Sequence, residues 1–163
     1  MFATLAIQNF LEVPLCSLMR TDEFLGKLDH DRIVRAIREA EEKTSGEIRV
    51  FFQRGSLKGD ALPAAQKQFR NLGMQKTKER NGVLIFVAPR ARKFAVIGDD
   101  GVHQKCGEEY WTRLVDSMRE HFQKEDFTQA LLEAIGRTGQ LLGQYFPKQG
   151  GGKNELPDEI IGS

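Results

Sequence analysis

Three acidic residues and one amide are the side chains whose spacing in this sequence points most directly to chemistry. Glu47 opens an apolar segment, Asn81 precedes a second, and Asp99-Asp100-Gly101 follows a third. If the first two segments are parallel strands and the third is antiparallel to the second, these positions all lie at one edge of the sheet. Carboxylate and amide oxygens suit hard cations such as Ca²⁺, which takes about 6–8 oxygen ligands. We therefore predict a metal site formed by Glu47, Asp99 and Asp100, with Asn81 as a supporting polar group.

Other interpretations compete with this site. An ordinary solvated turn is the alternative for Asp99-Asp100-Gly101, because Asp and Gly are common turn residues. His103 and Cys106 offer two zinc ligands, but a structural zinc site needs four. Cys106 also stands near a predicted helix N-terminus, which can lower a thiol pKa, although a small residue opening a helix is the simpler interpretation. The sequence contains no EF-hand, phosphate-binding loop, G-x-S-x-G or H-E-x-x-H motif.

Basic residues are concentrated in one stretch. Residues 67–93 carry a charge of +7 and the remainder carries −6, within a net charge of +1. Arg90, Arg92 and Lys93 lie together there and form a predicted patch for an anionic partner, either a protein or a membrane surface. A solvated helix face is the alternative. Nucleic-acid binding is not expected, because the patch offers no stacked aromatic side chains.

The elements that must position these residues follow from apolar periodicity. The pattern predicts helix 30–43, strand 47–53, helix 61–79, strand 82–88, strand 92–98, helix 107–122 and helix 127–145. Asp29 is a predicted N-cap, Gly46 a left-handed C-cap, and Asp126 with Gln129 a capping box. The short link after residue 88 requires an antiparallel hairpin, whereas the first two strands are joined by a crossover and should be parallel. This order predicts a three-layer α/β/α sandwich with a small mixed β-sheet.

Length and composition limit the remaining choices. A chain of 163 residues with 40% apolar residues suits one domain. We expect residues 1–23 to be an N-terminal extension, 24–147 the folded domain and 148–163 a flexible tail. Met19 is the predicted true start, with a packed N-terminal element as the alternative. No apolar run approaches the roughly 20 residues of a transmembrane segment. Two distant cysteines and no recognisable secretory signal favour a cytoplasmic location, and we expect a monomer.

Several short motifs occur in a fixed order, namely residues 40–41 (AE), 44–48 (TSGEI), 80–85 (RNGVLI), 97–101 (IGDDG) and 122–127 (FQKEDF). Over about residues 24–147 they resemble the TPM-domain family, which is named for a thylakoid lumen protein, a photosystem II repair factor and an acetylcholine-receptor modulator. The resemblance implies an α/β/α sandwich and divalent-cation binding, Ca²⁺ in particular. Its motifs map onto Glu47, Asn81, Asp99 and Asp100. We therefore expect a soluble binding or accessory module with a low-affinity Ca²⁺ site. The family's phosphatase label makes a metal-assisted phosphatase acting on phosphomonoesters the alternative.

Overall fold

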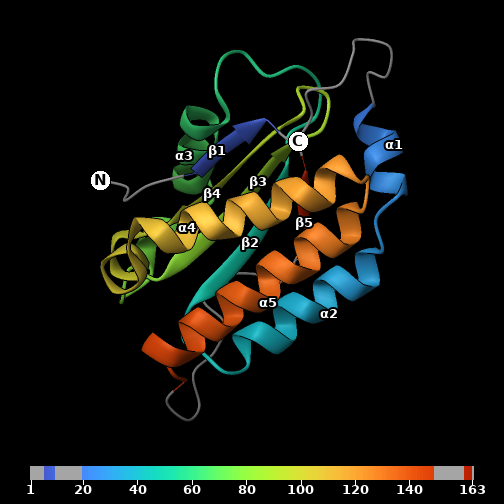
Figure 1. Cartoon of the computed structure of the whole chain (residues 1–163). Helices are drawn as coiled ribbons and strands as arrows, with labels where there is room; N and C mark the ends of the chain where they lie inside the picture. Colours follow the sequence, from blue (N-terminus) through green and yellow to red (C-terminus); the bar gives the residue numbers. More distant parts are fainter. Residues whose placement is uncertain (1–5, 10–19, 149–159, 163) are drawn as a thin grey trace.

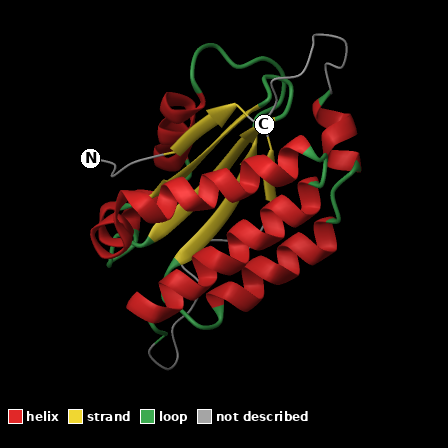
Figure 2. Cartoon of the chain, in the orientation of Figure 1, coloured by secondary structure: helices red, strands yellow, loops and turns green. Residues whose placement is uncertain are grey.

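A computed structural model describes residues 6–9, 20–148 and 160–162 of the chain. At its centre is a five-stranded sheet in the order β1-β4-β3-β2-β5. The strands are β1 (Ala6–Asn9), β2 (Glu47–Phe52), β3 (Gly82–Ala88), β4 (Lys93–Gly98) and β5 (Ile160–Gly162). Helices cover both faces of the sheet (Figure 1), and Figure 2 shows the same layers by type of element. The predicted three-layer α/β/α sandwich is therefore confirmed.

The three central strands have the predicted directions. β2 pairs in parallel with β3, and β3 pairs in antiparallel fashion with β4 through the short turn between them. β3 is buried along its whole length, as expected of an apolar strand covered on both faces. The edge strands β1 and β5 were not predicted, because each lies in a segment interpreted as an extension or tail. Met19 lies outside the described residues, and the domain boundaries stay predictions.

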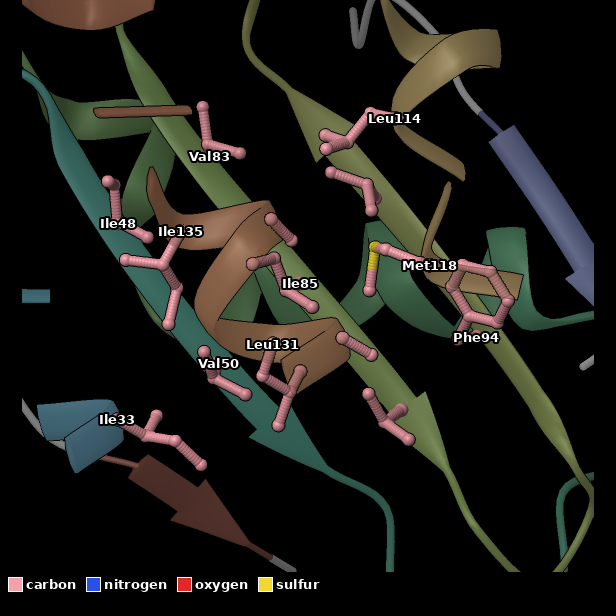
Figure 3. Packing of buried hydrophobic residues seen from close by; sticks show 14 of the residues in the cluster. Ile33, Ile48, Val50, Val83, Ile85, Phe94, Leu114, Met118, Leu131 and Ile135 are labelled. Carbon is pink, nitrogen blue, oxygen red and sulfur yellow. The ribbon is translucent and has the colours of Figure 1, made fainter. Parts of the chain in front are cut away.

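The helices divide unequally between the two faces. α2 (His30–Glu41), α4 (Asp100–Gln123) and α5 (Phe127–Tyr145) cover one face, with α1 (Thr21–Gly26) beside them, whereas α3 (Ala61–Asn71) covers the other (Figure 1). In Figure 3 Leu131 and Ile135 of α5 lie over Ile48, Val50 and Ile85 of β2 and β3, whereas Leu114 and Met118 of α4 lie over β4, with Met118 beside Phe94. Each such side chain contributes about 1.5–3 kcal/mol through burial, so these contacts hold α4 firmly on the sheet.

Two predicted helices have the wrong bounds. The helix predicted over 61–79 ends at Asn71, because Gly73 adopts a left-handed φ of 71° before the short 3₁₀ helix η1 (Met74–Lys76). The helix predicted to start at residue 107 starts at Asp100 instead. Gly107, with a non-helical φ of 74° and ψ of 176°, divides α4 into two helical segments at a kink, and the predicted helix corresponds to the second segment. The apolar pattern C-terminal to Gly107 was therefore found, and the first turns of α4 were missed.

The predicted helix caps have mixed outcomes. The Asp29 side chain accepts a hydrogen bond from the Arg32 backbone N–H at 3.2 Å, as expected of an N-cap. Asp126 precedes α5 but makes no side-chain capping bond, so the predicted capping box is wrong. Gly46 is not left-handed. A Cβ atom at Gly46 would lie 2.9 Å from Cδ1 of Leu142 and 3.1 Å from the Asn81 carbonyl oxygen, so this glycine lies where α5 and the start of β3 approach β2 closely.

Candidate functional site

Three strand ends meet at one edge of the sheet, as the predicted topology requires. The first residues of β2 and β3, Glu47 and Gly82, are paired, and the Asp99 N–H donates to the Gly82 carbonyl at 2.9 Å. The Glu47 N–H donates to the Asn81 carbonyl at 3.4 Å. The amino ends of β2 and β3 and the carboxyl end of β4 therefore lie side by side. This edge is where α4 begins, at the lower left of Figure 1.

Asp99 is the central residue of this edge. Its side chain is completely buried, and one carboxylate oxygen accepts from the Asp100 N–H at 2.8 Å, capping α4. Arg80 donates two further hydrogen bonds to Asp99, Nε to Oδ2 and Nη2 to Oδ1, each 2.8 Å long. The solvated turn considered for Asp99-Asp100-Gly101 is therefore wrong, because a buried cap and a bidentate ion pair occupy these residues.

Arg80 lies between the two aspartates, where the sequence suggested a metal ion. Its Nη2 atom is 3.8 Å from Oδ2 of Asp100 in addition to the bonds with Asp99. The hydrogen bond and charge of Asp99 raise the pKa of Arg80, against the effect of burial. In the sequence, Arg80 belongs to the basic stretch 67–93 and to the motif at residues 80–85, and neither feature pairs it with an aspartate. The register of the β3–β4 hairpin could have indicated this contact. Val83 pairs with Gly98, and continuing the pairing brings residue 80 opposite the Asp-Asp-Gly segment.

The backbone around Arg80 is tightly constrained. Arg80 has a φ of 53°, a left-handed conformation that is uncommon for residues with a side chain. Its carbonyl accepts from the Gly101 N–H at 3.0 Å. A Cβ atom at Gly101 would lie 2.2 Å from the Glu79 carbonyl oxygen and 2.7 Å from that of Arg80. A glycine after the two aspartates is thus required for this contact, which holds the loop of Arg80 against the start of α4.

A second polar group adjoins the ion pair. The buried Asn81 amide donates to Oγ of Ser45 at 3.1 Å and to Oε2 of Glu79 at 3.3 Å, and the Ser45 hydroxyl also donates to Glu79. Because a carboxylate only accepts hydrogen bonds, this arrangement fixes which amide atom faces Glu79. The other atom, Oδ1 of Asn81, is buried and has no hydrogen-bond partner among the described residues. Because nearly all buried acceptors in proteins have a hydrogen-bond donor, an acceptor without one points to a ligand that is not present in the structure.

Glu47 is kept apart from the two aspartates. Glu47, Gly82 and Asp99 form one row across adjacent strands, so the two acidic residues lie on either side of Gly82. A Cβ atom at Gly82 would lie 3.2 Å from the Met74 carbonyl oxygen and 3.5 Å from Cζ of Phe69, so these residues fill the space above it. Within the described part of the chain, no three His, Cys, Asp or Glu side chains are close enough to hold a metal ion together. The structure therefore joins Asp99 and Asp100 through Arg80 but does not add Glu47 to them.

The residues predicted to meet an anionic partner lie at the opposite end of β3. Arg90 is exposed in the turn between β3 and β4, and Arg92 has a left-handed φ of 53°. Lys93 Nζ donates to the Gly59 carbonyl at 3.2 Å and joins this turn to the loop after β2. The patch is thus separate from the Asp99 edge.

His103 and Cys106 form no zinc group in the structure's described part. His103 Nδ1 accepts from Nε1 of Trp111 at 3.3 Å, which uses the ring in packing α4. Burial raises the pKa of the Cys106 thiol to about 11. The lowered thiol pKa considered from the sequence is therefore wrong, because loss of water outweighs the lowering of the pKa by a backbone hydrogen bond.

The sequence is similar to a known protein family: the family model for the TPM domain matches residues 19–141. The chain belongs to the TPM-domain family. Among solved structures, the NMR structure of the BA42 protein from the psychrophilic bacterium Bizionia argentinensis is similar to this TPM domain, with 34% identity and a TM-score of 0.75. The match covers 92% of this chain and 99% of that one. No curated protein matches significantly. Within the described residues of this TPM domain, none of the helices has the length and apolar character needed to cross a membrane.

Proposed function

We propose that this TPM domain is a binding module that takes a divalent cation, Ca²⁺ in particular, at the edge formed by Asn81, Asp99 and Asp100. The observation that carries the proposal is the buried Oδ1 atom of Asn81, which has no partner among the described residues. Asn81 directly follows Arg80, whose guanidinium group bonds Asp99. The resemblance of the sequence motifs to those of cation-binding relatives supports the same site. Glu47 is left out, because Met74 and Phe69 lie between it and Asp99.

The side chains fit a hard cation better than a soft one. Asp99 and Asp100 would supply carboxylate oxygens and Asn81 an amide oxygen, with no nitrogen or sulfur ligand among them. Oxygen donors of this kind suit Ca²⁺ or Mg²⁺, whereas zinc sites in proteins usually include Cys or His. A bound cation would balance the negative charge of the two aspartates and satisfy the amide oxygen.

Arg80 sets the expected affinity of this site. Its guanidinium group already bonds both oxygens of Asp99, so a cation that coordinates Asp99 has to displace it. The Arg80 side chain is 41% exposed, which gives it a path into solvent. Displacement costs two charged hydrogen bonds, each worth about 1.5–3 kcal/mol, and this cost lowers the net affinity for the cation. We therefore infer a low-affinity site with Arg80 as its internal competitor.

Calorimetric or NMR titration with Ca²⁺ tests the proposal in four proteins: wild type, D99N/D100N, R80Q and the control D116N. Asparagine is also a good N-cap, so the double variant keeps the start of α4. Asp116 is a control because it pairs with Arg119 on the exposed side of α4, away from this edge.

We expect saturable binding to the wild type, with affinity reduced at least about tenfold in D99N/D100N and increased in R80Q. The control should bind as the wild type does. Lack of a response at millimolar Ca²⁺, or equal binding by D99N/D100N, would contradict the cation site. Equal binding by R80Q and wild type would contradict only the role of Arg80.

A cytoplasmic location belongs to the same proposal. It is supported by two cysteines that are 90 residues apart in sequence, which fits a reducing compartment. The monomeric state stays a prediction.

A further inference from the structure

The outer surface of the α3 layer carries an excess of positive charge, in which Asp60 and Glu79 are the exposed acidic residues. Residues 61–78 contain four basic residues and no acidic one. The loop before α3 and the β3–β4 turn add basic side chains at the other end of the layer. We define the basic face as the exposed members of this group: Lys58, Lys67, Arg70, Lys76, Lys78 and Arg90.

The opposite layer has the opposite excess. Residues 100–145, which form α4 and α5, contain eight acidic and five basic residues. The sheet separates the two layers, with α3 on one side and α4 and α5 on the other (Figure 1). A net charge of +1 therefore conceals a molecule whose two faces differ in sign. Such an asymmetry orients a protein in front of a charged surface.

The side chains of the basic face have few partners within the protein. Lys58, Lys67, Lys76, Lys78 and Arg90 make no ion pair with another described residue. This differs from α4, where Arg113 and Arg119 pair with acidic neighbours on their own helix. The charges of these five residues are thus available to a partner rather than balanced by ion pairs among the described residues.

The basic face lacks the aromatic anchors of other kinds of interface. Among the described residues, the one large hydrophobic side chain that is exposed is Tyr145, and it lies on α5 in the other layer. Protein partners are usually held by Trp, Tyr and Arg in central pockets, and single-stranded nucleic acids stack on aromatic rings. A partner of this face would be recognised by negative charge alone.

The dimensions of the face favour a broad anionic surface over a DNA groove. Arg90 follows the carboxyl end of β3, whereas Lys78 precedes its amino end. The seven residues of β3 span about 23 Å. The major groove of DNA is about 12 Å wide, and a recognition helix enters it. We propose that the basic face docks this protein on an anionic lipid surface, such as the cytoplasmic leaflet of a membrane, through contacts with headgroup phosphates and carboxylates.

Vesicle flotation tests this proposal with the full chain. Vesicles of phosphatidylcholine, with or without phosphatidylserine, are compared at low and high salt in the presence of EDTA, so that a cation at Asp99 plays no part. The test variant reverses four charges of the basic face: K67E, K76E, K78E and R90E. The matched control reverses four exposed charges on and just after α2: R32E, R35E, R38E and K43E. Glutamine versions of both sets are used if either variant fails to fold by circular dichroism.

We expect the wild type and the control to float with phosphatidylserine vesicles at low salt, and neither to float with pure phosphatidylcholine. Since each basic residue near an anionic membrane contributes a free energy of about 1 kcal/mol, the test variant should bind at least about 100-fold more weakly. Binding should be lost near 1 M salt, where the Debye length falls to about 3 Å. Failure of the wild type to float, or equal losses in test and control variants, would overturn the proposal. Tighter binding to duplex DNA than to the vesicles would overturn it in favour of nucleic acid.

Discussion

Replacing Arg80 by alanine should destabilise this domain far more than replacing an exposed arginine. The substitution removes both hydrogen bonds from Arg80 to Asp99. Of the hydrogen bonds described above, the completely buried Asp99 carboxylate then keeps the one from the Asp100 N–H. The loop that carries Arg80 also loses its ionic attachment to the start of α4. The substitution thus tests whether this ion pair holds the start of β3 against the end of β4 and the start of α4.

The size of the effect follows from burial. Breaking one side of a buried ion pair costs about 3–5 kcal/mol, because the remaining charge is left without a partner. Arg80 is 41% exposed, so water can enter where its side chain was and solvate Asp99 in part. We therefore expect a loss of about 2–3 kcal/mol in the free energy of unfolding. For a domain of this size that corresponds to a decrease of about 5–10 °C in Tm.

Urea unfolding of R80A, R80G and the control R113A measures this loss. Arg113 pairs with Glu109 at a site where both side chains are about three-quarters exposed, with values of 74% and 76%, and its removal should cost no more than about 0.5 kcal/mol. Glycine accepts the left-handed backbone of residue 80, so R80G should be more stable than R80A by about 1 kcal/mol or more. If R80A and R113A lose equal stability, the reasoning about the Asp99 pair is refuted.

Two further predictions concern the helical layer. The pKa of Glu133 is lowered, mainly by the hydrogen bond from Ser117 and also by His121 and Arg137. The ionised Glu133 side chain should therefore stabilise the folded domain above the ordinary pKa of Glu. This stabilisation should disappear as the pH falls through the folded-state pKa. Urea unfolding of E133Q should therefore show a deficit at neutral pH that shrinks towards pH 3, and a deficit independent of pH would contradict the charge contribution. The Cys106 thiol, with a pKa of about 11, should react with iodoacetamide at pH 8 about 100-fold more slowly than an ordinary thiol of pKa near 8.5. Site-resolved mass spectrometry measures the rate, and ordinary reactivity at Cys106 would contradict the raised pKa of its thiol.

The central elements could be predicted because their signals are local. β2, β3 and β4 lie where apolar runs are bounded by polar or glycine residues, and the short turn after β3 leaves no alternative to antiparallel pairing. α5 matches its predicted bounds because its apolar residues repeat at helical spacing along its whole length. The early end of α3 and the helical segment before Gly107 were missed, since glycines with positive φ follow the end of α3 and separate the two segments of α4.

Sequence patterns also brought Asp99, Asp100 and Asn81 to one edge of the sheet, because strand direction alone determines which ends meet. What occupies that edge depends on contacts between residues distant in the chain. Arg80 reaches Asp99 across 19 residues, and Asn81 reaches Ser45 across 36. The first contact requires the β3–β4 register and the left-handed turn at residue 80, and the second requires the β2–β3 register. No local periodicity specifies either register. Tertiary structure therefore decided that a guanidinium group, held by the buried Asp99, stands where the acidic residues alone suggested a metal ion.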